Sequence, residues 1–479
     1  MTRDIEHNKR WTALVLLCLG ELMIVLDTTI VNVALPSIRS DLGFSETSLV
    51  WVINAYMLTY GGFLLLGGRL GDLYGQKRLF LGGLAFFTLA SAACGFANSQ
   101  GLLITARAVQ GLGGAVVSAV ALSLIMNLFT EAGERAKAMG FYGFVCAGGG
   151  SVGVLLGGVL TSALSWHWIF LVNLPLGVAI YAACVRMLPQ DRLQGSNQKL
   201  DVAGALTITL SLMMAVYAIV GGNEAGWTSL QSVGLLGGAV VLLVAFIVIE
   251  SRVAAPLVPL GLFKLRNLTL ANIVGVLWAA SMFAWFFMSA LYLQLVLGYD
   301  AMLVGLAFLP SNLVMAAFSL GLSAKMVMRW GIRVPLSLGL ALVAAGLALF
   351  ARAPVDGTFW MDVQPGMLLL GLGVGMALNP VLLVAMGDVE PSESGLASGV
   401  VNTAFMMGGA LGLAILVAVA DARTAVLTAA GAATPVALNG GYQLAFLIGA
   451  IAAGAAAVIG GVWLRPKPMK AGHETTLHA

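Results

Sequence analysis

The sequence has few charged residues. Asp, Glu, Lys and Arg together make up 9% of its 479 residues, whereas soluble domains contain about 25% of these residues. Apolar residues make up 60%. This composition excludes an ordinary soluble globular fold and predicts an integral membrane protein.

Cysteine and histidine are also scarce, with four residues of each. None of them has the spacing of a metal site or of a disulfide framework. A membrane-embedded enzyme would need a cluster of His, Asp or Cys at the membrane interface, and the sequence has none. The net charge is only +3, and no basic patch with interleaved aromatics is present. We therefore expect no enzyme, no metal, no cofactor and no nucleic-acid partner.

Long polar segments are missing as well. The longest expected loops lie near 189–200, 251–267 and 420–441, and they are too short to hold the soluble output domain of a sensor. The first apolar run follows "MTRDIEHNKRW" and has no small-residue cleavage site. We therefore expect a retained first membrane span rather than a cleaved signal peptide.

The apolar residues are grouped into runs that match the thickness of a bilayer, which needs about 20 residues per helix. The sequence predicts fourteen such spans, at 12–35, 48–68, 79–97, 102–128, 137–163, 168–188, 202–221, 232–250, 268–293, 303–324, 334–351, 365–387, 396–419 and 442–464. The expected fold is an all-α integral membrane protein with fourteen transmembrane helices.

The basic residues are sorted by loop. All 24 lysines and arginines lie in the terminal segments or in alternate loops on one side, except Arg39, Arg352, Arg423 and Arg107. Because cytoplasmic loops carry an excess of Lys and Arg, this pattern predicts that both termini are cytoplasmic. The expected location is the cytoplasmic (inner) membrane.

An internal repeat organises the spans. At an offset of 256 residues, Arg69 corresponds to Lys325, Gly75 to Gly331 and Lys77 to Arg333. The chain is therefore expected to form a six-helix bundle (1–188), a linker with two inserted helices (189–267), a second six-helix bundle (268–464) and a tail (465–479). A parallel repeat of this kind is typical of transporters with a binding site near the bilayer midplane.

Four motifs fall in order along the first six spans: "LDTTIVNVALP" (26–36), "GGRLGDLYGQKR" (67–78), "RAVQGLGGA" (107–115) and "SWHWIFLVNLPLG" (165–177). With these motifs the chain resembles the major facilitator superfamily, in particular its fourteen-span drug:proton antiporters, over nearly its whole length. The resemblance implies transport without a cofactor, driven by the proton gradient.

The motif at 67–78 contains glycines that permit a tight turn and charges at the membrane face: Gly68, Arg69, Gly71, Asp72, Gly75, Lys77 and Arg78. These charges could serve only as a positive-inside anchor. The resemblance implies instead a gate in which Asp72 faces the N-terminal end of the thirteenth span, near 392–399.

Arg107 is the only basic residue deep in a span, where an arginine costs about 2.5–3.5 kcal/mol. It therefore needs a partner or water. Gln110, Gly111, Gly114 and Ser118 share its helix face. Arg107 could be structural, whereas the family pattern of Arg107, Gln110 and Gly111 implies a proton relay or an ion pair.

The fifth span contains Gly149, Gly153, Gly157 and Gly158 at the spacing of the family's antiporter motif. Glycines at such spacing also occur in ordinary close helix packing. Val154 stands where the motif has proline, which removes a helix kink and weakens the inference to strict antiport.

The first span holds two carboxylates, Glu21 and Asp27, about 9 Å apart along a helix and on different faces. Burial favours the neutral form of a carboxyl, and a nearby cation favours the charged form, so both can respond to protons. Asp27 lies in the family motif and is the stronger candidate for proton coupling, together with Arg107. Glu21 shares a face with Asn32 and is a candidate for contact with substrate.

A second candidate wall of the substrate cavity lies in the ninth span, where large polarizable groups share one helix face: Trp278, Met282, Trp285, Ser289 and Tyr292. Such a face suits flat hydrophobic or cationic molecules, although a lipid-facing aromatic stripe has the same pattern.

The sequence thus predicts proton-coupled efflux of small amphipathic or cationic compounds, with a dedicated exporter of one metabolite or antibiotic as the alternative. The expected partners are the small-molecule substrate, protons and the lipid bilayer. In a Gram-negative cell, a periplasmic adaptor would be a further partner.

Overall fold

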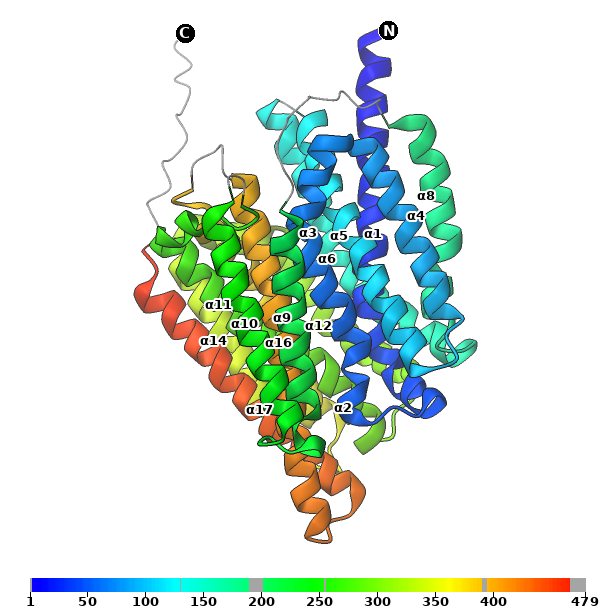
Figure 1. The fold of residues 1–479 in the computed structure, drawn as a ribbon, viewed down its shortest axis with the longest axis vertical. Coiled ribbons are helices and arrows are strands. Elements are labelled where there is room, and N and C mark those ends of the chain that lie inside the picture. Colours follow the sequence, from blue (N-terminus) through cyan, green and yellow to red (C-terminus); the bar gives the residue numbers. More distant parts are fainter. Residues whose placement is uncertain (1, 130, 189–200, 254–255, 390–393, 466–479) are drawn as a thin grey trace.

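The computed structural model describes residues 2–129, 131–188, 201–253, 256–389 and 394–465. Every regular element in these residues is a helix. In Figure 1 the helices run roughly side by side along the long axis of the molecule, with α1, α4 and α8 on the right of the view and α10, α14 and α17 on the left.

Each of the first six predicted spans corresponds to one helix or to a short helix followed by a longer one. Their bounds are α1 Thr2–Leu42, α2 Glu46–Leu49, α3 Trp51–Tyr74, α4 Gln76–Gly95, α5 Gln100–Leu128, α6 Ala132–Ala163, α7 Trp168–Leu171 and α8 Asn173–Met187. Although the antiporter motif has proline at position 154, α6 carries Val154 and continues through it.

The inserted spans and the second half follow. Their bounds are α9 Val202–Ala225, α10 Leu230–Arg252, η1 Leu260–Lys264, α11 Arg266–Leu291, η2 Tyr292–Val296, α12 Ala301–Ala317, η3 Phe318–Leu322, α13 Ser323–Trp330, α14 Arg333–Phe350, η4 Phe359–Val363, α15 Gln364–Met386, α16 Ser394–Ala429, α17 Thr434–Val458 and η5 Ile459–Trp463. The element η1 is a 3₁₀-helix, and η2 to η5 are single π-helical turns.

Thirteen helical stretches of the described residues are long and apolar enough to cross a membrane. The tenth predicted span, 303–324, differs, because α12 ends after 17 residues. It passes directly into the π-helical turn η3 and then into α13. A π-helical turn is a local insertion in an α-helix, so the helical path continues from Ala301 to Trp330 in three pieces.

The helices of the predicted first half and those of the predicted second half pair in the same way. In the first half α1 packs on α5, α6 and α8, α4 packs on α5 and α8, and α3 packs on α5. The counterparts in the second half make the same set of pairs: α11 packs on α15, α16 and α17, α14 packs on α15 and α17, and α12 packs on α15. The halves meet where α3 packs on α16 and α6 packs on α12.

The inserted helices are attached differently. α9 packs against α3 and α16, so it touches both halves, and α10 packs against α9. α10 is largely exposed. An apolar helix with an exposed surface is suited to contact with lipid.

The loops after the second and tenth spans share a backbone feature. Gly75 ends α3 with φ 98°, and Gly331 ends α13 with φ 72°. Only glycine adopts this region without strain. The two positions are related by the offset of 256 residues that the sequence repeat predicts.

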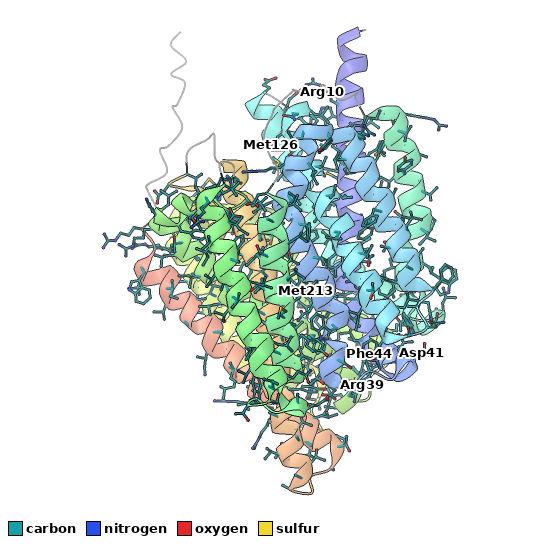
Figure 2. All side chains as sticks on the ribbon, viewed as in Figure 1. Arg10, Arg39, Asp41, Phe44, Met126 and Met213 are labelled. Carbon is teal, nitrogen blue, oxygen red and sulfur yellow. The ribbon has the colours of Figure 1, made fainter. Side chains whose placement is uncertain are left out.

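Ion pairs between helices lie at two opposite ends of the molecule. Arg10 pairs with Glu134 at one end (3.1 Å), and Arg39 pairs with Glu46 at the other (3.0 Å). Figure 2 shows Arg10 at the upper end and Arg39, Asp41 and Phe44 at the lower end. At the lower end the Trp166 indole N–H donates to Asp41 (2.8 Å).

The glycines of α6 bring its backbone close to α1. A Cβ on Gly149 would lie 2.9 Å from Leu22, and one on Gly157 would lie 2.6 Å from the Ile30 carbonyl oxygen. A Cβ on Gly153 would overlap the Thr29 hydroxyl. Contacts this close leave no room for a side chain, so α6 and α1 pack through small residues, as membrane helices commonly do.

Gly157→Ala tests this packing. The new methyl group would press on backbone of α1, and overpacking costs about 1–3 kcal/mol. We expect a lower melting temperature for the purified protein in detergent. Gly148→Ala on the same helix is the matched control, because a Cβ there meets nothing within 4 Å. Equal melting temperatures for the two variants would contradict the packing role.

Candidate functional site

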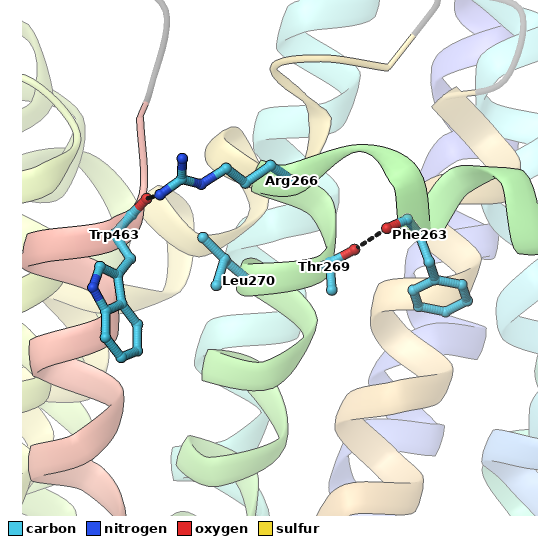
Figure 3. A pocket seen from close by; sticks show the side chains of 5 residues that line it. All are labelled: Phe263, Arg266, Thr269, Leu270 and Trp463. Atoms are coloured by element: carbon cyan, nitrogen blue, oxygen red, sulfur yellow. Dashed lines mark hydrogen bonds between the residues drawn. The ribbon is translucent and has the colours of Figure 1, made fainter.

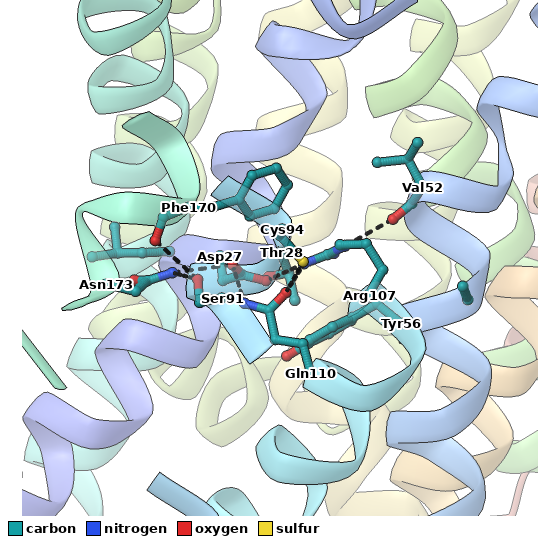
Figure 4. A network of polar contacts seen from close by, with 12 residues as sticks. Asp27, Thr28, Val52, Tyr56, Ser91, Cys94, Arg107, Gln110, Phe170 and Asn173 are labelled. Carbon is teal, nitrogen blue, oxygen red and sulfur yellow. Dashed lines mark hydrogen bonds and ion pairs between the residues drawn. The ribbon is translucent and has the colours of Figure 1, made fainter. Parts of the chain in front are cut away.

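A fully buried ion pair lies between α1 and α5. The Arg107 guanidinium donates to the Asp27 carboxylate at 2.5 Å, and the two side chains are 1% and 0% exposed. Figure 4 shows the pair at the centre of a network of polar side chains.

Two amides complete the surroundings of Asp27. Gln110 Nε2 donates to Asp27 Oδ1 at 2.7 Å, and Asn173 Nδ2 donates to the same oxygen at 3.1 Å. Asn173 also donates to the Ser91 hydroxyl (3.0 Å), which donates to the Phe170 carbonyl (2.9 Å). One carboxylate thereby connects α1 with α5 and α8, and through Ser91 with α4.

Arg107 has further partners besides Asp27. Its Nε donates to the Val52 carbonyl on α3 at 2.9 Å, and its Nη1 also donates to Gln110 Oε1 at 2.6 Å. The guanidinium carbon lies 4.4 Å from the centre of the Tyr56 ring and 5.5 Å from that of Phe170. Aromatic faces at these distances stabilise a cation.

Burying a charge is costly unless it is paired and hydrogen-bonded. Asp27 accepts from three donors and Arg107 donates to three acceptors, so each charge is offset in place. Protonation of Asp27 would remove the attraction for Arg107 and weaken its acceptor oxygens. The network therefore links the charge of one carboxyl to the contacts among α1, α3, α5 and α8.

Glu21 lies apart from this network. Glu21 is 5% exposed as a residue, and Ser118 on α5 and Tyr142 on α6 are the hydroxyl groups next to its carboxyl. Glu21 Oε2 has no hydrogen-bond partner among the described residues. The two carboxylates thus differ in their surroundings. Asp27 accepts hydrogen bonds from three donors, whereas one carboxylate oxygen of Glu21 has no donor among the described residues.

The other candidates for the substrate cavity are mostly buried. Asn32 is 7% exposed and donates to carbonyls of its own helix, those of Thr28 and Thr29. Trp278 packs edge-on against Phe405 of α16, with ring centres 5.3 Å apart. Trp285 lies 5.8 Å from Phe308 of α12.

The ninth-span face is therefore packed against protein, not against lipid. Trp278, Trp285, Ser289 and Tyr292 are each no more than 1% exposed, and Met282 is partly buried. Neither indole N–H of the two tryptophans has a hydrogen-bond partner among the described residues. The Tyr292 hydroxyl donates to the Pro354 carbonyl at 2.7 Å, and the Ser289 hydroxyl donates within its own helix.

Two cations of the 67–78 motif, Lys77 and Arg69, donate to backbone carbonyls of neighbouring segments. Lys77 donates to the carbonyls of Val185 (2.9 Å) and Leu188 (2.7 Å), at the end of α8. Arg69 donates to the Pro256 carbonyl. A cation at the position of Lys77 satisfies terminal carbonyls of a helix, whereas Pro256 lies in the segment between α10 and η1.

The remaining residues of this motif are placed in part. Gly71 packs on Val120 of α5, Gly68 is partly buried and Arg78 is exposed. The side chain of Asp72 and residues 390–393 lie outside the described part of the chain, and the predicted contact between them stays a prediction.

Two glycines of the motifs make close contacts with other helices. A Cβ on Gly111 would lie 2.5 Å from the Tyr56 carbonyl oxygen, which brings α5 against α3. A Cβ on Gly158 would lie 2.7 Å from the Ala301 carbonyl oxygen of α12. The last glycine of the fifth-span motif therefore contacts the other half of the molecule, not α1.

Sequence reasoning missed Ser91 and Asn173 in the polar network. Asn173 lies inside the quoted motif at 165–177, where it is the one amide in an apolar stretch, and that was a usable signal. Ser91 gives no comparable signal, because small hydroxyl residues are common in membrane helices.

Comparisons with known proteins agree with the fold and with the motifs. The family model of the Major Facilitator Superfamily matches residues 17–413. The chain belongs to this superfamily of membrane transporters, and it is a multi-pass membrane protein.

Two relatives are similar in sequence over most of this chain, and one solved structure is similar in fold. The chain is 41% identical to the puromycin resistance protein pur8 of Streptomyces alboniger, over 92% of this chain and 89% of that one. It is 35% identical to the multidrug resistance protein Stp of Mycobacterium tuberculosis (strain CDC 1551 / Oshkosh), over 83% of this chain and 73% of that one. A crystal structure of a mutant of the nucleoside transporter NupG covers 93% of this chain and 98% of its own, with a TM-score of 0.66 at 13% identity, and shares the fold.

A double-mutant cycle measures the buried pair. Asp27→Asn and Arg107→Gln each leave one member without its partner, and breaking a buried pair costs about 3–5 kcal/mol. We expect the double variant to lose much less free energy of unfolding than the sum of the single losses. Arg39→Gln, at a pair that is partly exposed, serves as the control and should cost under about 1 kcal/mol. Additive losses at Asp27 and Arg107 would contradict the coupling.

Proposed function

We propose that this protein exports small amphipathic or cationic compounds across the cytoplasmic membrane in exchange for protons. The observation that carries the proposal is the buried pair of Asp27 and Arg107, which connects several helices of a Major Facilitator Superfamily transporter. Ionisable groups inside a membrane span are costly, and they commonly mark substrate or proton pathways.

The direction of transport is supported by the relatives. Relatives of this chain are named for resistance to puromycin and to multiple drugs. A transporter gives resistance by lowering the drug concentration inside the cell. Efflux therefore fits the relatives better than uptake. A dedicated exporter of one antibiotic or metabolite is the alternative, and the puromycin resistance relative favours it.

Asp27 is the proposed coupling acid, and Arg107 its partner. With Asp27 charged, Arg107 holds α1 and α5 together and keeps its bond to α3. With Asp27 protonated, the ion pair is lost and the guanidinium relies on Gln110, Val52 and the Tyr56 ring. A proton thus changes which arrangement of helices has the lower free energy, as a ligand does when it binds one of two states better.

Glu21 and the ninth-span face are the proposed substrate contacts. Glu21 precedes Asp27 by about 9 Å along α1, so with a cytoplasmic N-terminus it is reached from the cytoplasm first. Its unpartnered oxygen can accept from a cationic substrate. The indole N–H groups of Trp278 and Trp285 have no partner among the described residues, and the two rings would offer flat surfaces to a substrate in an arrangement of the helices that uncovers them.

The proposed architecture has fourteen spans, arranged as a six-helix bundle (1–188), a linker with two inserted spans (189–267), a second bundle (268–464) and a tail (465–479). The matching helix pairs of the two halves and the shared backbone at Gly75 and Gly331 support the repeat. Counting α12 to α13 as one interrupted span gives the fourteenth.

Both termini are proposed to be cytoplasmic, and the 67–78 motif is proposed to be part of the cytoplasmic gate. The basic residues sorted by loop support this orientation. The proton gradient is the proposed energy source. In a Gram-negative cell, a periplasmic adaptor is a further proposed partner.

Thiol labelling tests the orientation. A cysteine placed at Gln76, in a version without native cysteines, should resist a membrane-impermeant reagent in intact cells, because that loop is expected inside. A cysteine at Ser99, on the opposite side, should react. Permeabilised cells provide the control, in which both should react. If only the cysteine at position 76 were labelled in intact cells, the orientation would be the opposite of the one proposed.

Transport by inverted vesicles tests the proposed roles of the two carboxylates. Asp27→Asn should abolish proton-driven accumulation of every substrate, because an amide releases no proton. Glu21→Gln should reduce the transport of cationic substrates more than that of neutral ones, because it removes one attraction for a cation and leaves the coupling acid in place. Substrate exchange without a gradient controls for folding. Proton-driven accumulation by Asp27→Asn would refute its coupling role.

A further inference from the structure

A groove lies on the surface of the second half, where the start of α11 meets η5 at the end of α17. It has a volume of about 420 Å³ and is lined by Phe263, Arg266, Thr269, Leu270 and Trp463. In Figure 3 the Arg266 side chain crosses the mouth of the groove toward the Trp463 backbone, with Leu270 and Thr269 below it and the Phe263 ring at the far side. None of these residues belongs to the Asp27 network.

The mouth of the groove is cationic. Arg266 donates one N–H group to the Trp463 carbonyl at 3.2 Å, and a guanidinium has five N–H donors in all. Lys264 lies two residues before it and is exposed. In the described part of the chain, neither cation forms an ion pair with a carboxylate.

The walls of the groove are apolar and open to the outside of the protein. Trp463 is 51% exposed and Phe263 is 40% exposed. The Thr269 hydroxyl is already used, since it donates to the Phe263 carbonyl at 2.7 Å. Exposed aromatic rings at the end of a membrane helix are typical of the level of the lipid headgroups.

A cation at headgroup level above an open apolar groove fits one ligand chemistry, a phosphate attached to a hydrocarbon chain. We propose that this groove binds an anionic phospholipid of the surrounding leaflet. The phosphate contacts the free N–H groups of Arg266, with Lys264 nearby, and an acyl chain lies along Leu270 between the Phe263 and Trp463 rings. Basic pockets beside membrane helices bind anionic headgroups in this way.

The site joins two distant parts of the chain. Next to the groove, the Asn267 amide donates to the Arg465 carbonyl (3.0 Å), the Arg465 N–H donates back to Asn267 (3.0 Å), and Asn267 also donates to Asp388 (2.6 Å). A lipid in the groove adds a further contact across the same junction. It therefore stabilises the association of α11 with the end of α17.

Native mass spectrometry of the purified full chain tests the proposal. Micelles are titrated with phosphatidylglycerol or with phosphatidylcholine, which differ in headgroup charge. A cation near an anionic headgroup favours binding by about fivefold, so we expect tighter retention of phosphatidylglycerol and a loss of about fivefold in Arg266→Gln. Arg266→Lys keeps the charge and should retain most of the preference.

Arg333→Gln is the matched control, because Arg333 is also exposed and is also the first residue of a membrane helix, α14. It should leave retention unchanged. Equal retention of the two lipids by the wild type, or no loss in Arg266→Gln, overturns the proposal. If Arg333→Gln lost as much retention of phosphatidylglycerol, the preference would come from general surface charge. If inorganic phosphate displaced the lipid completely, the groove would bind the free ion. Either result overturns the lipid site.

Discussion

The bilayer provides almost no water to a buried charge, and the arrangement of the first half follows from that constraint at Asp27 and Arg107. Neither charge can remain in an apolar span without the other. Their pairing requires α1 and α5 to approach at this depth, and the remaining donors and acceptors fix α3 through Val52 and α8 through Asn173. A buried network in which both charges are hydrogen-bonded favours the arrangement of helices that keeps these contacts.

Close packing of backbones provides the second constraint. Membrane helices gain little from the hydrophobic effect between themselves, because lipid tails are as apolar as their side chains. Gly149, Gly153 and Gly157 compensate by letting α6 approach the turns of α1 that carry Asp27. The glycines and the ion pair therefore act on the same stretch of α1 from two sides, which holds the carboxyl in a fixed position.

The all-helical membrane fold could be predicted from the sequence because the bilayer sets the length of a span, and thirteen of the fourteen expected runs correspond to a helical stretch of spanning length among the described residues. The interruption at Phe318–Leu322 could not be predicted, since a π-helical turn depends on tertiary contacts and not on composition. At the site, Arg107 and Gln110 were predictable as residues of one helix face. Ser91 was not, because it reaches Asp27 only through Asn173, and a chain of two hydrogen bonds between distant spans leaves no spacing in the sequence.

The contact between α6 and α12 has a kinetic consequence. Gly158 faces the Ala301 carbonyl, and Gly305 faces the Val154 carbonyl, so at these two positions α6 and α12 touch through backbone and not through interlocked side chains. A surface of this kind can rotate without changing rotamers. If the two predicted halves rotate against each other during transport, these backbone contacts need no change of rotamer, which favours a fast movement. At the contact between α3 and α16, Met406 and Met407 pack over Gly61, and the same rotation would require their side chains to repack.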